Sequence, residues 1–400
     1  MTIAVVIDSL ERFYFVRRLV KALDKEGDFV FMTSEPLAHL FFRLEGRHSI
    51  YLRRAKNNSS GLAYGSSLFD RSIEVMNGTI DAHVARQDWM ATFTAALDVF
   101  NRLAITVCVM WNGQQLICRA VGHACSTYGV RVRFLELSNL PEKLFADDEG
   151  VNALSTVARD PSIIDRFSMP DLSEHERWLR RYEEYKRRPL PQSQTSIRRK
   201  GLSLLNYAVK VLTQGVGRKR LDRSRASNGV RLPAIASSIG EDALISRRYV
   251  FLPLQVSGDT QIKLHSDVDN LEAIRIALEL AESEGMDLIV KLHPAENDRA
   301  VIDEIARLQT IHQFQIVTTA AVDLIKHAAM VVTINSTVGL EAMLYGKKVV
   351  ALGRCLYREF DRDRLMKYIH GFLVDGIDYF GNGPIDPRAA RRVFSNDGRI

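Results

Sequence analysis

Short hydrophobic runs and amphipathic stretches alternate along most of the chain. In the first 165 residues, hydrophobic runs at 3–7, 29–33, 49–53, 104–110 and 132–137 predict strands. Apolar positions at helical spacing separate them, as in residues 10–26 and 87–103. Strands that alternate with helices form parallel sheets covered on both faces, so this part is predicted to be an α/β domain.

The same alternation returns from residue 248 to about residue 380, with predicted strands at 249–252, 288–292, 315–318, 330–334 and 348–352. Residues 166–247 instead read as a basic helical linker, and residues 381–400 as a C-terminal tail. The predicted fold class is therefore α/β, with two Rossmann-like domains, 1–165 and 248–380, that face a cleft. This plan is similar to the GT-B fold of nucleotide-sugar glycosyltransferases, a likeness of fold alone.

Polar residues follow two predicted strands of the second half, where parallel sheets bind their ligands. Asp259 lies in the loop after strand 249–252, between Gln255 and Gln261, which are candidate substrate contacts. It is a candidate nucleophile, although a single loop aspartate is usually a turn former. Lys291 and His293, at the end of strand 288–292, are candidates to bind the donor nucleotide. The imidazole is a candidate to bind phosphate or carboxylate or to move a proton, and the alternative is a structural histidine at a strand end.

The clearest ligand signal is the turn from strand 330–334 into a helix, where Asn335 is a further candidate to bind the donor nucleotide. Ser336 and Thr337 offer hydroxyls at the positive end of that helix, which favours a nucleotide phosphate there. Gly339 is expected to let a ligand or strand approach closely, and Glu341 to lie near the ribose. The alternative is an ordinary helix N-cap.

Three residues of the first half are candidates for the acceptor side. Glu136, near the end of strand 132–137, is a candidate general base. Asn112 and Gly113 follow strand 104–110, where the Asn is expected to cap the next helix and the Gly to allow a tight turn. Asn152 lies in an acidic, turn-forming loop at 147–153.

Positive charge is concentrated in one segment. The formal net charge is +6, yet residues 179–225 hold 14 Lys and Arg against 3 Asp and Glu. This segment carries no signature of a nucleic-acid-binding module, so nucleic acid is not an expected partner. Amphipathic and basic helices bind anionic membrane surfaces, which is the predicted role of 179–225. The alternative is a solvated helical face.

The sequence predicts neither a metal site nor a secretory leader. The four cysteines show no close pairing, so zinc binding is not expected and the thiols are predicted to be reduced in the cytosol. No basic leader with a long apolar core and no run of about 20 apolar residues is present.

Taken together, these motifs resemble the bacterial capsule-polysaccharide β-Kdo transferases of the KpsS, KpsC and WbbB type. The matching elements follow one order across residues 110–357. They are Trp-Asn-Gly at 111–113, Phe-Leu-Glu at 134–136, Glu-Gly-Val-Asn-Ala at 149–153, Arg-Asp-Pro at 159–161, Leu-Gln-Val-Ser-Gly-Asp-Thr-Gln-Ile at 254–262, Lys-Leu-His-Pro at 291–294 and Val-Val-Thr-Ile-Asn-Ser-Thr-Val-Gly at 331–339. One departure is Leu-Ser-Asn at 137–139, where the family often has a Gly.

The resemblance implies a retaining transferase that moves Kdo from CMP-β-Kdo to a lipid or glycan acceptor in capsule or surface polysaccharide synthesis. Asp259 matches the family's nucleophile, Glu136 its acid/base candidate and His293 its His-Pro histidine. Apart from the donor substrate, no cofactor or metal is implied. The expected location is cytoplasmic, peripheral on the inner face of the bacterial inner membrane, with other capsule or O-antigen assembly proteins as candidate partners.

Two other functions fit the same pattern. One is a GT-B transferase that uses another nucleotide sugar. The other is a non-catalytic capsule assembly or export protein that only holds a glycan.

Overall fold

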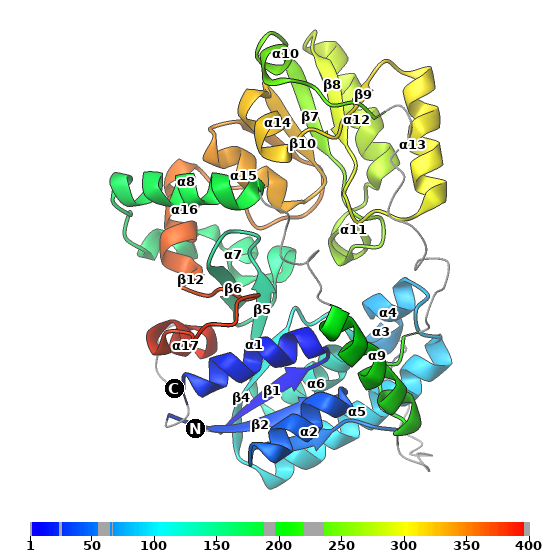
Figure 1. The fold of residues 1–400 in the computed structure, drawn as a ribbon, viewed down its shortest axis with the longest axis vertical. Coiled ribbons are helices and arrows are strands. Elements are labelled where there is room, and N and C mark those ends of the chain that lie inside the picture. The colour runs from blue at the N-terminus through cyan, green and yellow to red at the C-terminus, as the bar shows by residue number, and fades with distance from the viewer. Residues whose placement is uncertain are drawn as a thin grey trace. The chain divides into compact units, whose positions relative to one another are not determined.

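The computed structural model describes residues 2–23, 26–54, 65, 67–187, 197–219 and 236–395. The chain forms two compact units (Figure 1). The first holds Met1–Thr156, Pro189–Leu221 and Leu373–Ile400, and the second holds Val157–Arg188 and Asp222–Phe372. The segment predicted as a linker, 166–247, is thus divided between the units, and the predicted tail belongs to the first.

The first unit is built on a seven-stranded sheet of order β12-β6-β5-β4-β1-β2-β3. Its strands are β1 (Thr2–Ile7), β2 (Asp28–Thr33), β3 (His48–Tyr51), β4 (Ile105–Trp111), β5 (Arg131–Leu137), β6 (Lys143–Asp147) and β12 (Val374–Asp375). Strands β1 to β5 are parallel and match the five predicted strands, whereas β6 and β12 are antiparallel and were not predicted.

Helices cover both faces of this sheet. They are α1 (Leu10–Lys21), α2 (Pro36–Leu44), α3 (Ser67–Asp70), α4 (Ile73–Met76), α5 (Ala82–Arg102), α6 (Leu116–Tyr128), the 3-10 helix η1 (Asn152–Leu154), α9 (Ile197–Leu212) and α17 (Pro387–Phe394). Alternate side chains of β1 belong to two hydrophobic cores, one on each face of the sheet. Ile3 and Val5 pack with α1, α2 and α17. Ala4 and Val6 pack with α5 and α6. This is the period of two expected of a strand buried on both faces.

The second unit has a five-stranded parallel sheet of order β11-β10-β7-β8-β9. Its strands are β7 (Tyr249–Pro253), β8 (Asp287–Lys291), β9 (Gln315–Ile316), β10 (Met330–Thr333) and β11 (Lys348–Ala351). In β7, Val250 and Leu252 face one core, and Tyr249 and Phe251 face the other. The predicted fold class, two Rossmann-like α/β domains, is confirmed.

The helices of the second unit come from the segment predicted as a linker and from the chain on both sides of it. They are η2 (Pro161–Arg166), α8 (Leu172–Arg187), α10 (Glu241–Ile245), α11 (Thr260–His265), α12 (Asn270–Ser283), α13 (Arg299–Ile311), α14 (Ala321–His327), α15 (Thr337–Leu344), α16 (Arg362–Lys367) and the π-helical turn η4 (Tyr368–Phe372), while α7 (Thr156–Arg159) lies at the division between the units.

Helix α8 carries the start of the basic segment 179–225, and it is packed within the second unit. Trp178 and Tyr182 are buried. The Tyr182 hydroxyl donates to Glu341 Oε2 at 2.6 Å, and Lys186 Nζ donates to Glu341 Oε1 at 2.6 Å. The basic segment is therefore not one continuous surface element.

Two further expectations concern the cysteines and the membrane. Cys108, Cys118, Cys125 and Cys355 carry free thiols, the first three of them buried. Within the described ranges, no helix combines the length and the apolar character that crossing a bilayer requires.

Candidate functional site

Three loops of the second unit carry the predicted donor-site residues. Asp259 follows β7, His293 follows β8 and Ser336 follows β10. These strands are neighbours in the sheet, in the order β10-β7-β8, and all run parallel. Their carboxyl ends therefore meet at one edge, the edge at which open α/β sheets bind ligands.

Asp259 is the N-cap of α11, and its Oδ1 accepts the backbone N–H of Gln261 at 2.9 Å. Burial raises the pKa of this carboxyl, while the Gln261 hydrogen bond and the charge of His293 act in the opposite direction. The side-chain Oε1 of Gln261 is itself buried and accepts no hydrogen bond from the described part of the chain. A partly buried carboxylate and an unpaired amide oxygen therefore lie on one short helical turn.

His293 is held in a defined tautomer. The backbone N–H of Ala295 donates to its Nδ1 at 3.1 Å, so the proton of the neutral ring lies on Nε2. Desolvation lowers the pKa of His293, and the negative charges of Asp259 and Glu296 partly counteract it. The two predicted catalytic residues are thus close enough for each to shift the pKa of the other.

Glu296, which was not predicted as a site residue, joins the loops that carry Asp259 and His293. Its Oε2 accepts from Ser257 N at 2.7 Å and from Ser257 Oγ at 2.6 Å. Its Oε1 accepts from the backbone N–H groups of Asn297 and Asp298, at 2.8 and 2.9 Å. Burial acts to raise the pKa of Glu296, but these hydrogen bonds outweigh it and lower the pKa. An acid after a His-Pro turn reads in sequence as an ordinary loop residue.

Gln255 and Asn335 hold the loops after β7 and β10 together. Gln255 Nε2 donates to Asn335 Oδ1, and Asn335 N donates back to Gln255 Oε1, both at 3.1 Å. Asn335 Nδ2 also donates to the carbonyl of Gln261 at 2.9 Å. Both residues are buried. Their amides therefore position the start of α15 against α11, and this is where the structure places two of the residues predicted to contact the donor or substrate.

The start of α15 has a Ser336 N-cap, which was the alternative interpretation of this motif. Ser336 Oγ accepts the backbone N–H of Val338 at 3.2 Å, and Thr337 is the first helical residue. Gly339 does allow a close approach, and the group that approaches it in the structure is the Tyr357 side chain. A Cβ at Gly339 would lie 2.4 Å from the hydroxyl oxygen of Tyr357, because that side chain fills the space.

Two more predicted donor-site residues point elsewhere. Glu341 is buried and bonded to Tyr182 and Lys186 of α8, as described above, so the expectation that it lies near a ribose is not met. Lys291 Nζ donates to the carbonyls of Thr318 and Thr319 in the loop after β9, at 3.0 and 2.7 Å. Burial lowers the pKa of Lys291.

In the first unit, Glu136 and Asn112 lie at the carboxyl ends of the paired strands β5 and β4. Glu136 is partly buried, and its Oε1 accepts the backbone N–H of Leu137 at 3.0 Å. Asn112 does not cap a helix as predicted, since α6 begins at Leu116. Its Oδ1 instead accepts the backbone N–H of Gln114 at 3.0 Å and closes a turn.

Gly113, next to Asn112, and Asn152, the third candidate in the first unit, both have a positive φ. Gly113 has a φ of +81°, and a Cβ there would lie 2.7 Å from the Phe134 ring, so the turn requires glycine. Asn152 begins η1 with a φ of 51°. The loop before it is organised by the buried Asp147, which accepts from the backbone of Glu149 and Gly150 at 2.9 and 3.2 Å.

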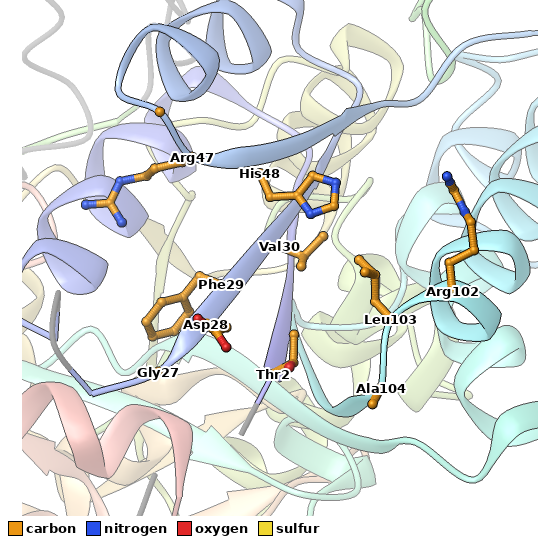
Figure 2. Close-up of a pocket in the computed structure, with 11 residues that line it drawn as sticks. Thr2, Gly27, Asp28, Phe29, Val30, Arg47, His48, Arg102, Leu103 and Ala104 are labelled. Carbon is orange, nitrogen blue, oxygen red and sulfur yellow. The ribbon is translucent and has the colours of Figure 1, made fainter.

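The first unit contains a pocket of about 530 Å³, and Figure 2 draws the residues that line it. It is lined by the first residues of β1, β2 and β3 and by the residues just before β4. It therefore lies at the amino edge of the sheet, opposite the edge that carries Glu136 and Asn112. The basic side chains Arg47 and Arg102 at its rim form ion pairs with Glu45 and Asp98.

Comparison with known proteins gives one family and several relatives. A model of the family described as "Capsule polysaccharide biosynthesis protein" matches residues 109–360. Protein FixF of Sinorhizobium fredii is 38% identical over 112 residues, 27% of each chain. The capsule polysaccharide export protein KpsS of Escherichia coli is 25% identical over 260 residues, 57% of this chain and 62% of that protein. The chain thus spans 27% to 62% of the length of these relatives.

Similar solved structures are more distant. A β-Kdo 2,7 transferase, KpsC of Thermosulfurimonas dismutans, is 17% identical with a TM-score of 0.42, and the match covers 72% of this chain and 84% of that one. The UDP-GlcNAc 2-epimerase of Methanocaldococcus jannaschii is 14% identical with a TM-score of 0.30, over 98% and 99% of the two chains.

Proposed function

The chain belongs to the capsule polysaccharide biosynthesis protein family, and on that basis we propose that it is a retaining glycosyltransferase. Its donor would be CMP-β-Kdo and its acceptor a lipid or a glycan. The family match at residues 109–360 covers all of the motifs at 110–357 that resemble β-Kdo transferases.

One observation carries the proposal. Asp259, His293 and Ser336 converge on one carboxyl edge, from loops that follow three neighbouring strands. Asp259 and His293 influence each other's pKa, and Ser336 opens a helix whose positive end can receive a phosphate. A carboxylate, a hydrogen-bond donor and an anion site are the groups that a displacement at a sugar phosphate requires.

In the first step, Oδ2 of Asp259 attacks the anomeric carbon of Kdo. The bond between that carbon and the phosphate oxygen breaks, and CMP leaves with the electron pair. The Gln261 N–H on Oδ1 orients the carboxylate for this attack. The Ser336 hydroxyl and the dipole of α15 stabilise the charge that develops on the leaving phosphate, so the step does not depend on a metal ion.

His293 serves the same step as a neutral donor. Its Nε2–H is directed by the Ala295 hydrogen bond to Nδ1, and it binds the phosphate or the carboxylate of Kdo. Gln255 and Asn335 then act as positioning residues, since their amides are bonded to each other.

In the second step, the acceptor hydroxyl attacks the same carbon, and the bond to Asp259 breaks, with net retention of configuration. The acceptor proton goes to a general base, a role that the sequence resemblance assigns to Glu136. Glu136→Gln should then still form the sugar–Asp259 adduct but pass the sugar to the acceptor at least about a hundredfold more slowly, the usual size of general-base catalysis.

Release of CMP from CMP-Kdo tests the proposal. The protein should release CMP and should leave UDP-sugars unchanged. Asp259→Asn should abolish release, whereas Asp267→Asn should not, because the exposed Asp267 only pairs with Arg354 at the surface. Faster release from a UDP-sugar would favour the alternative of another nucleotide-sugar donor.

The name of the Escherichia coli relative, a capsule polysaccharide export protein, supports a second candidate function. In it the chain assembles or exports capsule polysaccharide without catalysis, and Asp259→Ala leaves cellular glycan unchanged. Loss of the glycan in a cell that makes normal amounts of Asp259→Ala protein would contradict this candidate.

A further inference from the structure

Helix α9, in the first unit, presents its apolar face to solvent. Of its side chains from 199 onward, only Asn206 and Lys210 are buried, one turn apart on the same face. The opposite face consists of Leu204, Leu205, Ala208, Val211 and Leu212, at the spacing of one helical stripe. All five are exposed, Leu204 by 67% and Leu212 by 81%. An amphipathic helix of a monomeric soluble protein normally turns this stripe inward.

The inverted orientation has a physical cause. Glu35, after β2, is buried and needs partners, and α9 supplies them: Lys210 Nζ donates to Glu35 Oε1 at 2.7 Å, and Asn206 Nδ2 donates to Oε2. Asn206 Oδ1 also accepts the backbone N–H of Leu37, in the first turn of α2, at 3.1 Å. The polar face of α9 is thus fixed on the protein, which leaves the leucines outside.

The residues that follow α9 are also bonded to the rest of the first unit, so α9 is attached firmly while its apolar face is exposed. Gly215 forms an antiparallel bridge with Arg53, and Val216 N donates to the Leu52 carbonyl at 3.2 Å. Gly217 N donates to Asp88 Oδ2 at 2.9 Å. A buried, bonded segment therefore anchors the C-terminal end of the helix.

Charge indicates what covers this face. Residues 197–219 contain six Lys and Arg and no Asp or Glu. Arg199 and Lys200 are exposed near the start of α9, and Lys219 is exposed beyond its end. Helix α2, which contacts α9, carries two more exposed leucines, Leu40 and Leu44. An apolar stripe with cationic ends and no acid matches the interface of a negatively charged bilayer, where leucines enter the acyl boundary and cations meet the headgroups.

We propose that this face of α9 docks the protein on an anionic phospholipid membrane. It is a narrower surface than the predicted segment 179–225, since α8 is packed within the second unit and residues 220–235 lie outside the described residues. The proposal concerns where the protein binds and does not depend on which sugar it transfers.

Vesicle co-sedimentation of the full chain tests the proposal. Vesicles of phosphatidylcholine with phosphatidylglycerol are compared with pure phosphatidylcholine, with Leu204→Ser/Leu212→Ser as the variant. The control is Ile311→Ser, which removes a side chain exposed by 58% in the second unit. The wild type and the control should bind the anionic vesicles, more weakly in high salt, and the variant should lose about tenfold in affinity per leucine.

Three results would overturn the proposal. The first is a wild-type protein that binds neither kind of vesicle. The second is a Leu204→Ser/Leu212→Ser variant that binds anionic vesicles as well as the wild type does. The third is a wild-type protein that forms a dimer in solution and binds no vesicles, while the variant is a monomer. Because the substituted leucines are exposed, the melting temperature should not change. If that variant does not fold, Leu205→Ser/Val211→Ser on the same stripe must give the predicted loss.

Discussion

Glu296 offers the sharpest test of how the candidate site is held. Its carboxylate is 3% exposed and accepts four hydrogen bonds, two from Ser257 and one each from Asn297 and Asp298. Glu296→Gln keeps the size of the side chain but turns one acceptor oxygen into a donor. We expect the new NH2 group to replace Oε2 and to face Ser257. The Ser257 backbone N–H then loses its acceptor, while the Ser257 hydroxyl can rotate to accept a hydrogen bond from the NH2 group.

The magnitude follows from these contacts. A hydrogen bond to a charged group contributes about 1.5–3 kcal/mol, and Glu296→Gln removes one and weakens the others. We expect a loss of about 2–4 kcal/mol in the free energy of unfolding. Ser257 lies in the loop that carries Asp259, and a misplacement of about 1 Å can cost about a hundredfold in rate. The turnover of CMP-Kdo should therefore fall by about that factor.

The assays are urea unfolding and CMP release, with Asp298→Asn as the matched control. Asp298 caps α13 by accepting from Ala300 and Val301, and asparagine caps helices about as well, so the control should change stability by less than about 0.5 kcal/mol. Because hydrogen bonding lowers the pKa of Glu296 in the folded state, its contribution is present above the ordinary pKa of the carboxyl. That contribution is lost as pH falls through the folded pKa, so the difference between the wild type and Glu296→Gln should shrink in acid.

A Glu296→Gln protein that matches Asp298→Asn in both stability and turnover would refute this reasoning. So would a loss of stability that is the same at neutral and acidic pH, because the carboxylate would then not be its source.

Three further outcomes are expected. Glu341→Gln should destabilise the protein by about 3 kcal/mol in urea unfolding, because it breaks a buried ion pair. Unchanged stability together with a loss of donor affinity would instead indicate that Glu341 binds the nucleotide. Gly339→Ala should cost about 1–3 kcal/mol, because the new Cβ meets Tyr357, and an unchanged melting temperature would contradict that packing. Burial raises the pKa of Asp259, so turnover should fall on the acid side above the pH of a free aspartate. His293→Gln removes a positive charge in that range and should move this limb to higher pH, which a pH–rate profile would show.

Most of the fold could be predicted because the sequences of buried parallel strands are continuous apolar runs. All ten parallel strands were expected, with boundaries close to those observed. Strands β6 and β12 were missed because their pairing is decided by tertiary contacts: β6 begins with the buried Lys143, which pairs with Asp375 of the two-residue β12. A short segment with charged ends reads as a loop until its partner is known.

The candidate site was predictable where it depends on topology. Asp259, His293 and Ser336 each follow a strand, and the strand order brings the three loops together. It was not predictable where it depends on the direction of one side chain. Glu341 looked like a nucleotide ligand but is bonded to α8, 159 positions from Tyr182, and Glu296 looked like a loop acid but links the site. Sequence carries no signal for either partner.

The measurement that tests the central claim most directly is the mass of the protein after incubation with CMP-Kdo in the absence of acceptor. The account predicts one added Kdo, located by peptide mapping on Asp259 and absent from Asp259→Asn. Kdo transfer that proceeds at the normal rate in Asp259→Asn, or an adduct mapped to a different residue, would contradict it.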